Sequence, residues 1–558
     1  MPRVAAIGLD AAEWTLVERL LADGEMPHLE RLRARSAVAQ LQDPADYRTG
    51  LVWEHFLTGR GAASNMRWAA VEFDPLTYEV WQEGARPTTP FYVSDPPLPA
   101  VIFDVPYTTL GHEVDGAVVV GWGGHDPGHP RASLPAGLLD EIDARFGPHP
   151  AFANDYEPIW HRADAIDRLC DALIVGTTRR ADAARWLLER NPHWELFVTV
   201  LSEPHSAGEH LWHGVDPHHP AAGTPTAALA GRRLREVYRA VDDALGRLLA
   251  GLPADASVVV FAMHGMGPND ADVASMVLLP ELLMRLQTGR SLLRGPPAPH
   301  WDTSGRAPIV PVGGWSPYVS QFVHSGAPLA TRLRGEARHQ LRRLRPSRSP
   351  APPPGGASGA LGRRIEPETL LSPAEIGVPR SSVAWQIPMR YRRWWPKLEA
   401  FALPTFYDGR IRLNVRGRER DGLVDPADYT ATCERLEGQL HACRDARTGG
   451  PLVERVDRLR SADPFASGGP DADLQVVWAS TADALVHPTI GRIGPIPYRR
   501  TGGHSPNGFA FVSGPDIDTC DLGLRHAHDV TPTVLHLLGR PLPRTFDGCP
   551  LVGGGSTR

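Results

Sequence analysis

Short apolar runs that end in a polar tip recur along the chain. Residues 4–9, 196–201 and 257–261 form three such runs, which are rich in β-branched side chains and have the length of buried strands. Long stretches at about 163–190 and 231–249 carry apolar residues three and four positions apart, as amphipathic helices do. Strands that alternate with helices in this way predict an α/β fold with a doubly wound, mostly parallel sheet flanked by helices.

Shorter patterns fit the same architecture. We expect helices over about residues 14–23 and from residue 27 onward, because apolar positions fall on one helical face. Further short strands are expected at residues 101–103 and 117–120. Another helical run follows Thr49. These elements assign the first half of the chain to one α/β core.

The character of the sequence changes near residue 285. At 558 residues the chain is too long for one ordinary core. We expect residues 1–285 to form the first part of the core, residues 286–470 to form a large inserted segment, and residues 471–558 to complete the core. Within the insert, the Pro- and Arg-rich stretch near 345–365 predicts a disordered linker.

The second half of the chain contains fewer clear patterns. Residues 406–415 alternate like a hairpin, and residues 426–443 read as a helix. The core sheet is expected to resume with a strand at 473–478. A strand at 509–512 and a closing helix over 529–539 would complete it.

Composition narrows the classes of function. Apolar residues make up 42% and charged residues 22% of the chain, which is typical of a globular protein. The net charge of −6 gives no electrostatic reason to expect nucleic-acid binding. Five scattered cysteines argue against a disulfide framework and against a Cys-rich zinc module. No apolar run has the length of a membrane span, and the N-terminus does not resemble a signal peptide, so we expect a cytoplasmic protein without a membrane partner.

The twelve residues 202–213, S-E-P-H-S-A-G-E-H-L-W-H, follow one of the buried strands directly. Ligands of open α/β sheets bind beyond the carboxyl ends of the strands. His205 and Glu209 are four positions apart, so on a helix they would share a face and could bind one metal ion. A polar loop with surface histidines is the alternative, and the residues of this stretch alone do not decide between the two.

Four more candidate residues occupy similar positions. Asp10 and His264 each lie just beyond a predicted strand, and His504 lies in a Gly-rich loop before one. Thr49 precedes a helix, where it could act as an N-cap or, beside the backbone N–H groups, as a nucleophile toward a phosphate. Asp10 could likewise cap the helix after it. Taken together, these residues predict a composite site of nitrogen and oxygen ligands suited to zinc or a similar cation.

Six segments carry a resemblance to a known family. They are, in order, G-L-D-A-A-E-W (8–14), T-G-L-V-W-E-H-F-L-T-G (49–59), S-E-P-H-S-A-G-E-H (202–210), F-A-M-H-G-M-G (261–267), G-G-H-S-P-N-G (502–508) and D-V-T-P-T-V-L-H-L-L-G (529–539). In order and spacing they resemble the alkaline phosphatase superfamily, and within it the type I phosphodiesterase/nucleotide pyrophosphatase-like branch. The resemblance covers about residues 1–285 and 380–550, and it implies the alkaline-phosphatase-like α/β fold.

The resemblance also implies roles for the candidate residues. In that family an acid (here Asp10), a Thr or Ser (here Thr49) and an Asp-His pair hold one metal ion. An Asp-x-x-x-His pair and a late histidine (here His504) hold the other. The Thr or Ser attacks phosphorus and forms a covalent intermediate, which water then hydrolyses. Thr49 is therefore the expected nucleophile, and no cysteine lies near the strand ends to replace it.

Three positions depart from the family pattern. His205 stands where the family has Asp, and Glu209 stands where it has His, although His210 could serve in place of Glu209. Met263 replaces the Asp of the Asp-His pair, which leaves Asp10, Thr49 and His264 for that ion. Because a thioether is a poor ligand for a hard cation, the second ion should be held weakly or not at all.

The sequence thus predicts a metal-dependent hydrolase of phosphate esters, either diesters or pyrophosphates, that acts through Thr49. The cofactor would be one or two divalent ions, with zinc the first choice and manganese or iron as alternatives. The partner would be a small phosphorylated substrate, and the insert would shape its pocket. Two rivals keep the same site: a phosphoryl-group transferase, and a protein that binds a phosphorylated ligand with little or no turnover.

Overall fold

The fold is built around a nine-stranded sheet with the order β21-β2-β20-β9-β1-β8-β5-β6-β7. The computed structural model describes residues 2–43, 46–84, 86, 88–123, 131–151, 158–294, 300–311, 314–323 and 380–553. In sheet order the strands are β21 (Cys520–His526), β2 (Ala37–Gln42), β20 (Asn507–Ser513), β9 (Ser257–Ala262), β1 (Val4–Leu9), β8 (Leu196–Leu201), β5 (Pro99–Phe103), β6 (Asp115–Val120) and β7 (Ala132–Leu134).

The central strands of this sheet are parallel. β1 pairs in parallel with β8 and β9, β5 pairs in parallel with β8 and β6, and β2 pairs in parallel with β21. The antiparallel pairs involve β20 and the edge strand β7. The prediction of a mostly parallel sheet is therefore confirmed.

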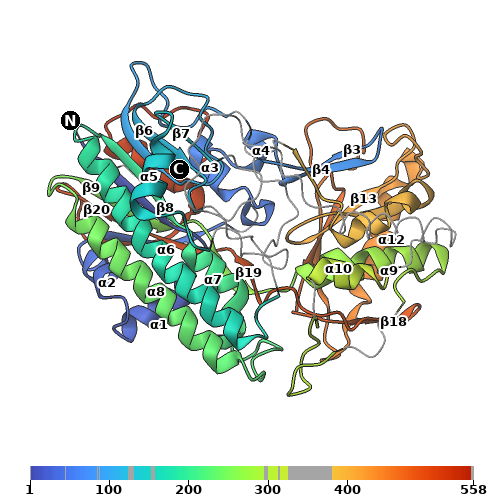
Figure 1. Cartoon of the computed structure of the whole chain (residues 1–558). Coiled ribbons are helices and arrows are strands. Elements are labelled where there is room, and N and C mark those ends of the chain that lie inside the picture. The colour runs from blue at the N-terminus through green and yellow to red at the C-terminus, as the bar shows by residue number, and fades with distance from the viewer. Residues whose placement is uncertain are drawn as a thin grey trace, which may run out of the picture.

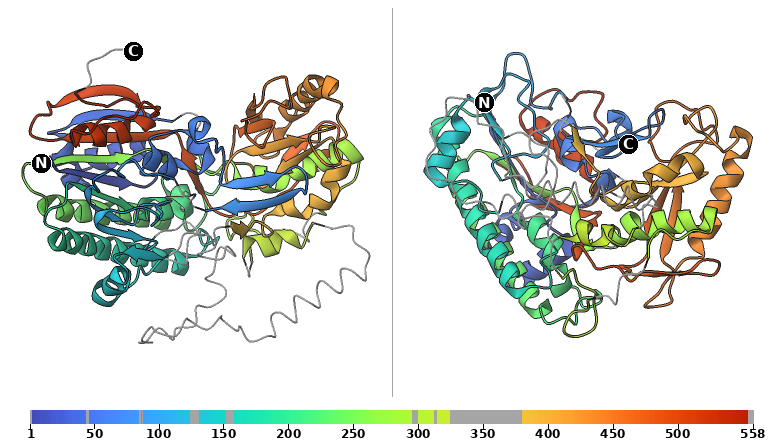
Figure 2. Two further views of the ribbon diagram at one scale, coloured as in Figure 1. Left: turned by 90° about the horizontal axis from the view of Figure 1, so that it is seen from above. Right: turned by 45° about the vertical axis from the view of Figure 1, so that its right-hand side comes forward.

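Helices cover both faces of the sheet. Alternate residues of β1 point to opposite faces: Ala5 and Ile7 pack in one apolar cluster, and Val4 and Ala6 pack in another. The first face carries α1 (Trp14–Ala22), α2 (Pro27–Arg33), α5 (Leu138–Phe146), α6 (Ala163–Arg190) and α8 (Ala227–Ala250). The second face carries α3 (Val52–Thr58) and α13 (Val530–Leu537). Figure 1 shows α6 and α8 side by side, and Figure 2 shows the sheet between the two helical layers.

A second body with its own apolar core lies beside the sheet (Figure 1). It contains the four-stranded antiparallel sheet β12-β13-β16-β15, whose strands are Ala400–Leu403, Gly409–Leu413, Leu474–Trp478 and Val453–Arg458. Helices α9 (Leu279–Thr288), α10 (Trp315–Ser320) and α12 (Tyr429–His441) belong to this body. So do strands β3 (Val71–Asp74) and β4 (Glu79–Glu83). β4 is the middle strand of a three-stranded antiparallel sheet and pairs with both β3 and β11 (Arg380–Ser382).

Two expectations about this part of the chain are corrected. The strand predicted at 473–478 exists as β16, but it pairs with β13 and β15 and not with the central sheet. An apolar run indicates a buried strand but does not indicate which strand it pairs with. The strand at 473–478 was therefore predicted in the wrong sheet. Residues 406–415 supply only one strand of a hairpin, β13, because its partner β12 lies earlier in the chain. The linker predicted near 345–365 lies outside the described residues.

Two further small sheets lie outside the two main sheets. β14 (Arg444–Asp445), β17 (Leu485–His487) and β18 (Gly491–Ile493) form a three-stranded sheet, and β10 (Gly265–Pro268) and β19 (Gly502–Ser505) form a two-stranded ribbon. After β19 the chain re-enters the central sheet as β20, antiparallel to β9. None of the helices in the described part of the chain is both long enough and apolar enough to cross a membrane.

Candidate active site

Three neighbouring parallel strands bring candidate residues to one edge of the sheet. β9, β1 and β8 lie side by side, and their carboxyl ends are followed by His264, Asp10 and His205. The backbone N–H of Asp10 donates to the carbonyl of Leu201 at 2.9 Å, which ties the ends of β1 and β8 together. The strand-end placement expected from the sequence is therefore what the structure shows.

His205 and Glu209 lie on helix α7 (Glu203–Leu211), which begins directly after β8. Pro204 in the first turn favours helix initiation there, because its missing N–H is not needed for helical hydrogen bonds. The Nε2 atom of His205 lies 3.8 Å from Oε1 of Glu209. The two side chains thus share one face of a buried helix, and the alternative of a surface loop is excluded.

His504, from the C-terminal part of the chain, lies next to His205. It lies in strand β19 and not in a loop, and it is level with Met266 of β10 in the antiparallel ribbon. The ribbon lies directly on α7: a Cβ atom at Gly502 would come within 2.2 Å of the carbonyl oxygen of Gly208. Glycine at this position therefore permits the close approach that brings His504 to His205.

The histidines form a continuous group. Nε2 of His205 lies 2.8 Å from Nε2 of His504. The rings of His504 and His264 have centroids 4.3 Å apart, and Nε2 of His264 lies 3.9 Å from Oδ1 of Asp10. Oδ1 of Asp10 also accepts a 2.8 Å hydrogen bond from the indole Nε1 of Trp53 on α3. Five of the six sequence-predicted residues are thus neighbours.

The group lines a cleft between the two bodies. Asp10, His205, Glu209, His264 and His504 contribute to its wall. The remaining lining residues are Gly50, Val52, Trp53, Ala70, Gln82, Tyr107, Phe406, Tyr407 and Arg500. Aromatic side chains from both bodies therefore face the same space as the histidines.

The donor atoms fit a divalent ion in chemical type, since imidazole nitrogen and carboxylate oxygen are ordinary zinc ligands. Within the described residues they meet as pairs, and not as a group of three with all ligand atoms within 4.8 Å. Glu209 also forms an ion pair with Arg500, whose Nε lies 2.9 Å from Oδ2 of Asp272. Arg500 was not predicted from the sequence, because it lies before β19 and outside the strand-end pattern.

Thr49 lies at the end of a short 3-10 turn (Asp46–Thr49) and is 8% exposed. Its hydroxyl oxygen accepts a 3.0 Å hydrogen bond from the backbone N–H of Leu51. Gly50, which lines the cleft, has a φ of +73° and packs against the ring of Tyr407. Arg48, the neighbour of Thr49, is half-buried and pairs with Asp408 at 2.5 Å.

Met263 is 2% exposed and packs in the apolar cluster on the α3 face of the sheet. β1 and β9 pair with Gly8 opposite Phe261. Two residues further along, this register would set Met263 level with Asp10. The sequence expectation that methionine occupies a position beside the Asp10 carboxylate is consistent with this register.

Two buried carboxylates that the sequence did not single out hold the site in place. Glu13 accepts a 2.6 Å hydrogen bond from Ser505, the neighbour of His504, and burial raises the pKa of Glu13. Glu203, on α7, contacts Arg180 and His149 at 3.0 and 3.1 Å. Burial acts to raise the pKa of Glu203, but the charge of Arg180 and the hydrogen bond from His149 outweigh it and lower this pKa to about 2.

No curated protein matches the chain significantly. Among solved structures, one match is phosphonoacetate hydrolase from Sinorhizobium meliloti 1021 in complex with phosphonoformate, with 12% identity, a TM-score of 0.45, and coverage of 97% of this chain and 95% of that chain. So low a score supports no conclusion about this chain. The family model for type I phosphodiesterase / nucleotide pyrophosphatase matches residues 4–304, which is more than half of the chain. The resemblance seen in the sequence is thereby confirmed: the chain belongs to the type I phosphodiesterase/nucleotide pyrophosphatase family, a family of phosphoesterases.

Proposed function

We propose that the protein is a metal-dependent hydrolase of phosphodiesters or pyrophosphates that acts through Thr49. The observation that carries this proposal is the contact of His205 with His504 at 2.8 Å, in a cleft that Asp10, His264 and Glu209 also line. Residues from three strand ends and a ribbon, more than 490 positions apart in sequence, converge on one cavity. That arrangement supports a binding centre over a set of unrelated surface histidines.

Zinc is the ion we propose. One zinc ion would be held by His205, His504 and Glu209. A second ion would be held more weakly by Asp10, His264 and Thr49. Such an ion, when bound, would supply a Lewis acid for the phosphoryl oxygens and would favour the alkoxide of an adjacent hydroxyl. Trp53 orients the Asp10 carboxylate through its 2.8 Å hydrogen bond. Glu13 holds Ser505 and thereby fixes the backbone beside His504.

In the proposed reaction the Thr49 hydroxyl oxygen attacks phosphorus and the alcohol or phosphate leaving group departs. Water then breaks the bond between phosphorus and the threonine oxygen, which restores Thr49. The Thr49 oxygen accepts one hydrogen bond, from the N–H of Leu51, and its second lone pair is the one that would attack phosphorus. The half-buried rings of Phe406 and Tyr407 supply apolar surface for the organic part of the substrate.

A second candidate function has a specific observation in its favour. Arg500 neutralises Glu209 with a guanidinium group, so the site already contains a cation at one of its proposed ligands. Met263 also withholds a ligand at the neighbouring position. Both features favour a protein that binds a phosphorylated ligand and turns it over slowly or not at all. A transferase with an alcohol acceptor would use the same residues.

Replacing His205 and His504 together with alanine tests the proposal. We expect the double variant to lose about one equivalent of bound zinc and at least a hundredfold in turnover of an aryl phosphodiester, given what the loss of metal support costs elsewhere. Elemental analysis and a colorimetric assay measure both. A control, His218→Ala, removes an exposed histidine and should change neither. Unchanged metal content in the double variant would contradict the site assignment. Metal binding without turnover of any diester would favour the binding protein.

A further inference from the structure

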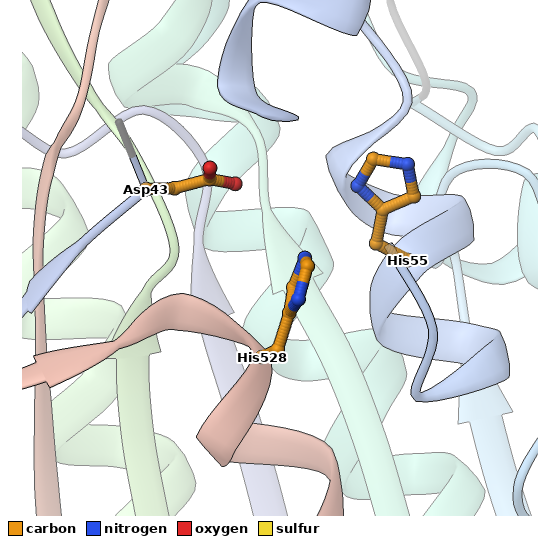
Figure 3. A group of neighbouring side chains, drawn as sticks. All are labelled: Asp43, His55 and His528. Atoms are coloured by element: carbon orange, nitrogen blue, oxygen red, sulfur yellow. The ribbon is translucent and has the colours of Figure 1, made fainter. Parts of the chain in front are cut away.

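A second group of potential metal ligands lies at the same edge of the sheet and outside the cleft wall. It consists of Asp43, His55 and His528, and each offers one ligand atom such that all three atoms lie within 4.8 Å of one another. Figure 3 shows the carboxylate of Asp43 pointing toward the two imidazoles. Nothing in the strand-end pattern of the sequence had marked these residues.

The fold itself brings the three residues together. β2 and β21 are parallel neighbours with Gln42 opposite His526, so their carboxyl ends meet at one edge. Asp43 follows β2 directly, and His528 lies in the 3-10 turn (Ala527–Asp529) that follows β21. His55 comes from α3, which is fastened to the start of α13 by a 2.7 Å hydrogen bond from the Thr531 hydroxyl to the carbonyl of Phe56. The convergence therefore rests on regular elements and not on loops.

Burial distinguishes this group from a surface cluster. Asp43 is 1% exposed and His55 is 2% exposed, while His528 is half-buried at the rim. Burying an ionised carboxylate to this degree costs free energy of folding unless a cation or strong hydrogen-bond donors compensate its charge. The two imidazoles are nearly perpendicular, with an interplanar angle of 83° and centroids 5.7 Å apart, so they do not stack on each other. The carboxylate of Asp43 lies near a ring nitrogen of each histidine.

The donor set points to a particular class of ion. Two imidazole nitrogens and one carboxylate oxygen suit zinc or a similar first-row divalent ion, and three protein ligands leave a coordination position open. The half-buried rim at His528 supplies a route of entry from solvent. Alkaline-earth ions would prefer a set made of oxygens.

The other group of similar composition in the described residues provides a contrast. His28, Asp242 and Asp243 also place their ligand atoms within 4.8 Å. There, however, both oxygens of Asp242 accept backbone N–H groups, from His28 at 3.0 Å and from Leu29 at 2.8 Å, at the start of α2. Asp243 is exposed. That carboxylate is a helix cap, and the group is suitable as a control.

We propose that Asp43, His55 and His528 bind a zinc-class divalent ion that clamps α3 to the ends of β2 and β21. Trp53, two positions from His55 on the same helix, donates to Asp10 in the cleft. Residues two positions apart on a helix point to roughly opposite sides. The ion would therefore hold α3 on one side while Trp53 contacts the proposed active site on the other. This site is independent of the proposed function.

The test uses the full chain with His205→Ala and His504→Ala, which removes the stronger of the two proposed zinc positions in the cleft. The weaker position, at Asp10, His264 and Thr49, is common to every variant compared. After removal of metal with a chelator, equilibrium dialysis against zinc should show about one bound equivalent, and zinc should raise the melting temperature. Adding His528→Ala should lower the zinc affinity at least tenfold and remove that rise in melting temperature. Asp243→Asn, in the control group, should leave both unchanged.

Two outcomes would overturn the proposal. The first is a His205→Ala/His504→Ala protein that binds no zinc. The second is unchanged zinc binding after His528→Ala. Because His528 is at the rim, its replacement is less disruptive than that of buried His55. If His528→Ala nevertheless misfolds, diffraction at the zinc absorption edge from crystals of the His205→Ala/His504→Ala protein decides, since a peak between Asp43 and His55 is required.

Discussion

Two groups of polar side chains are attached to the same short helix, α7, and they differ in whether they border the cleft. On one side, Glu203 contacts Arg180 at 3.0 Å, and Arg180 contacts Asp104 at 2.6 Å, with all three side chains almost fully buried. On the other side, His205 and Glu209 face the cleft together with His504. Both Glu203 and Glu209 pair with an arginine, but the first group is enclosed by the protein, whereas the second borders a cavity that a ligand can enter.

The difference shows what each group is for. A buried network with every charge paired fixes the position of a helix and has little freedom to react. A group of imidazoles and a carboxylate at a cleft can accept an ion or a substrate. Glu203 and His205 are only two positions apart, so α7 transmits the rigidity of the network to the proposed ligands. We therefore expect damage to the network to affect stability first, and damage to the cleft group to affect chemistry first.

The largest effect on stability is expected from Arg180→Met. It would leave the Asp104 and Glu203 carboxylates buried without their shared cation, and breaking such a pair destabilises proteins by about 3–5 kcal/mol. Denaturant unfolding measures the change. The matched control is Arg168→Ala, whose partner Asp164 and own side chain are both 67% exposed, and it should change stability by less than about 1 kcal/mol. An equal loss of unfolding free energy in the two variants would contradict the claim that the buried ion pairs of Arg180 contribute more to stability than the exposed ion pair of Arg168.

A slightly smaller effect on the free energy of unfolding is expected when the pH is lowered. The pKa of Glu203 is lowered from 4.5 to about 2 in the folded protein, so the unfolded chain binds its proton more tightly. The resulting stabilisation is fully present above about pH 4.5 and is lost as the pH falls toward 2. It is on the order of 3 kcal/mol. Glu203→Gln should flatten this part of the profile of unfolding free energy against pH. A variant profile as steep as that of the wild type would show that other groups cause the acid lability.

The smallest expected effect is a change in the amount of bound zinc when Met263 is replaced. Met263→Asp would place a carboxylate level with Asp10, and we expect it to increase bound zinc by about one equivalent relative to the wild type. Equilibrium dialysis at matched free zinc measures the increase. Met263→Asn is the control, because it has similar size and polarity but no charge. An increase with asparagine as large as that with aspartate would show that the charge is not what the site lacks.

Much of the fold could be predicted from the sequence because its signals are local. The strand at 4–9 and the helix at 163–190 have the bounds that their apolar patterns indicate. The strand at 473–478 was also found, but it was assigned to the wrong sheet. Pairing depends on residues far away in the chain, and a single apolar run contains no information about them.

The candidate site was predicted in part for a related reason. Asp10, His205 and His264 stand at strand ends, and parallel strands share one edge, so their proximity follows from the topology. Arg500 and the triad of Asp43, His55 and His528 could not be found in this way. Arg500 acts through an ion pair with Glu209 that only the ribbon β10–β19 creates. The triad depends on the pairing of β2 with β21, two strands separated by more than 470 residues.

The most direct test of the central claim is the turnover of an aryl phosphodiester by Thr49→Ala and Thr49→Ser, measured together with their melting temperatures. If Thr49 is the nucleophile, Thr49→Ala should lose a thousandfold or more in kcat, on the order of what nucleophile removal costs elsewhere, and Thr49→Ser should keep part of the activity. Thr49→Ala should lose about 1 kcal/mol of stability in either case, because it removes the acceptor of the Leu51 N–H, so kcat is the deciding quantity. The contradictory result is a Thr49→Ala protein with nearly normal kcat that has lost about 1 kcal/mol of stability, since that is what a threonine that only caps a backbone N–H would show.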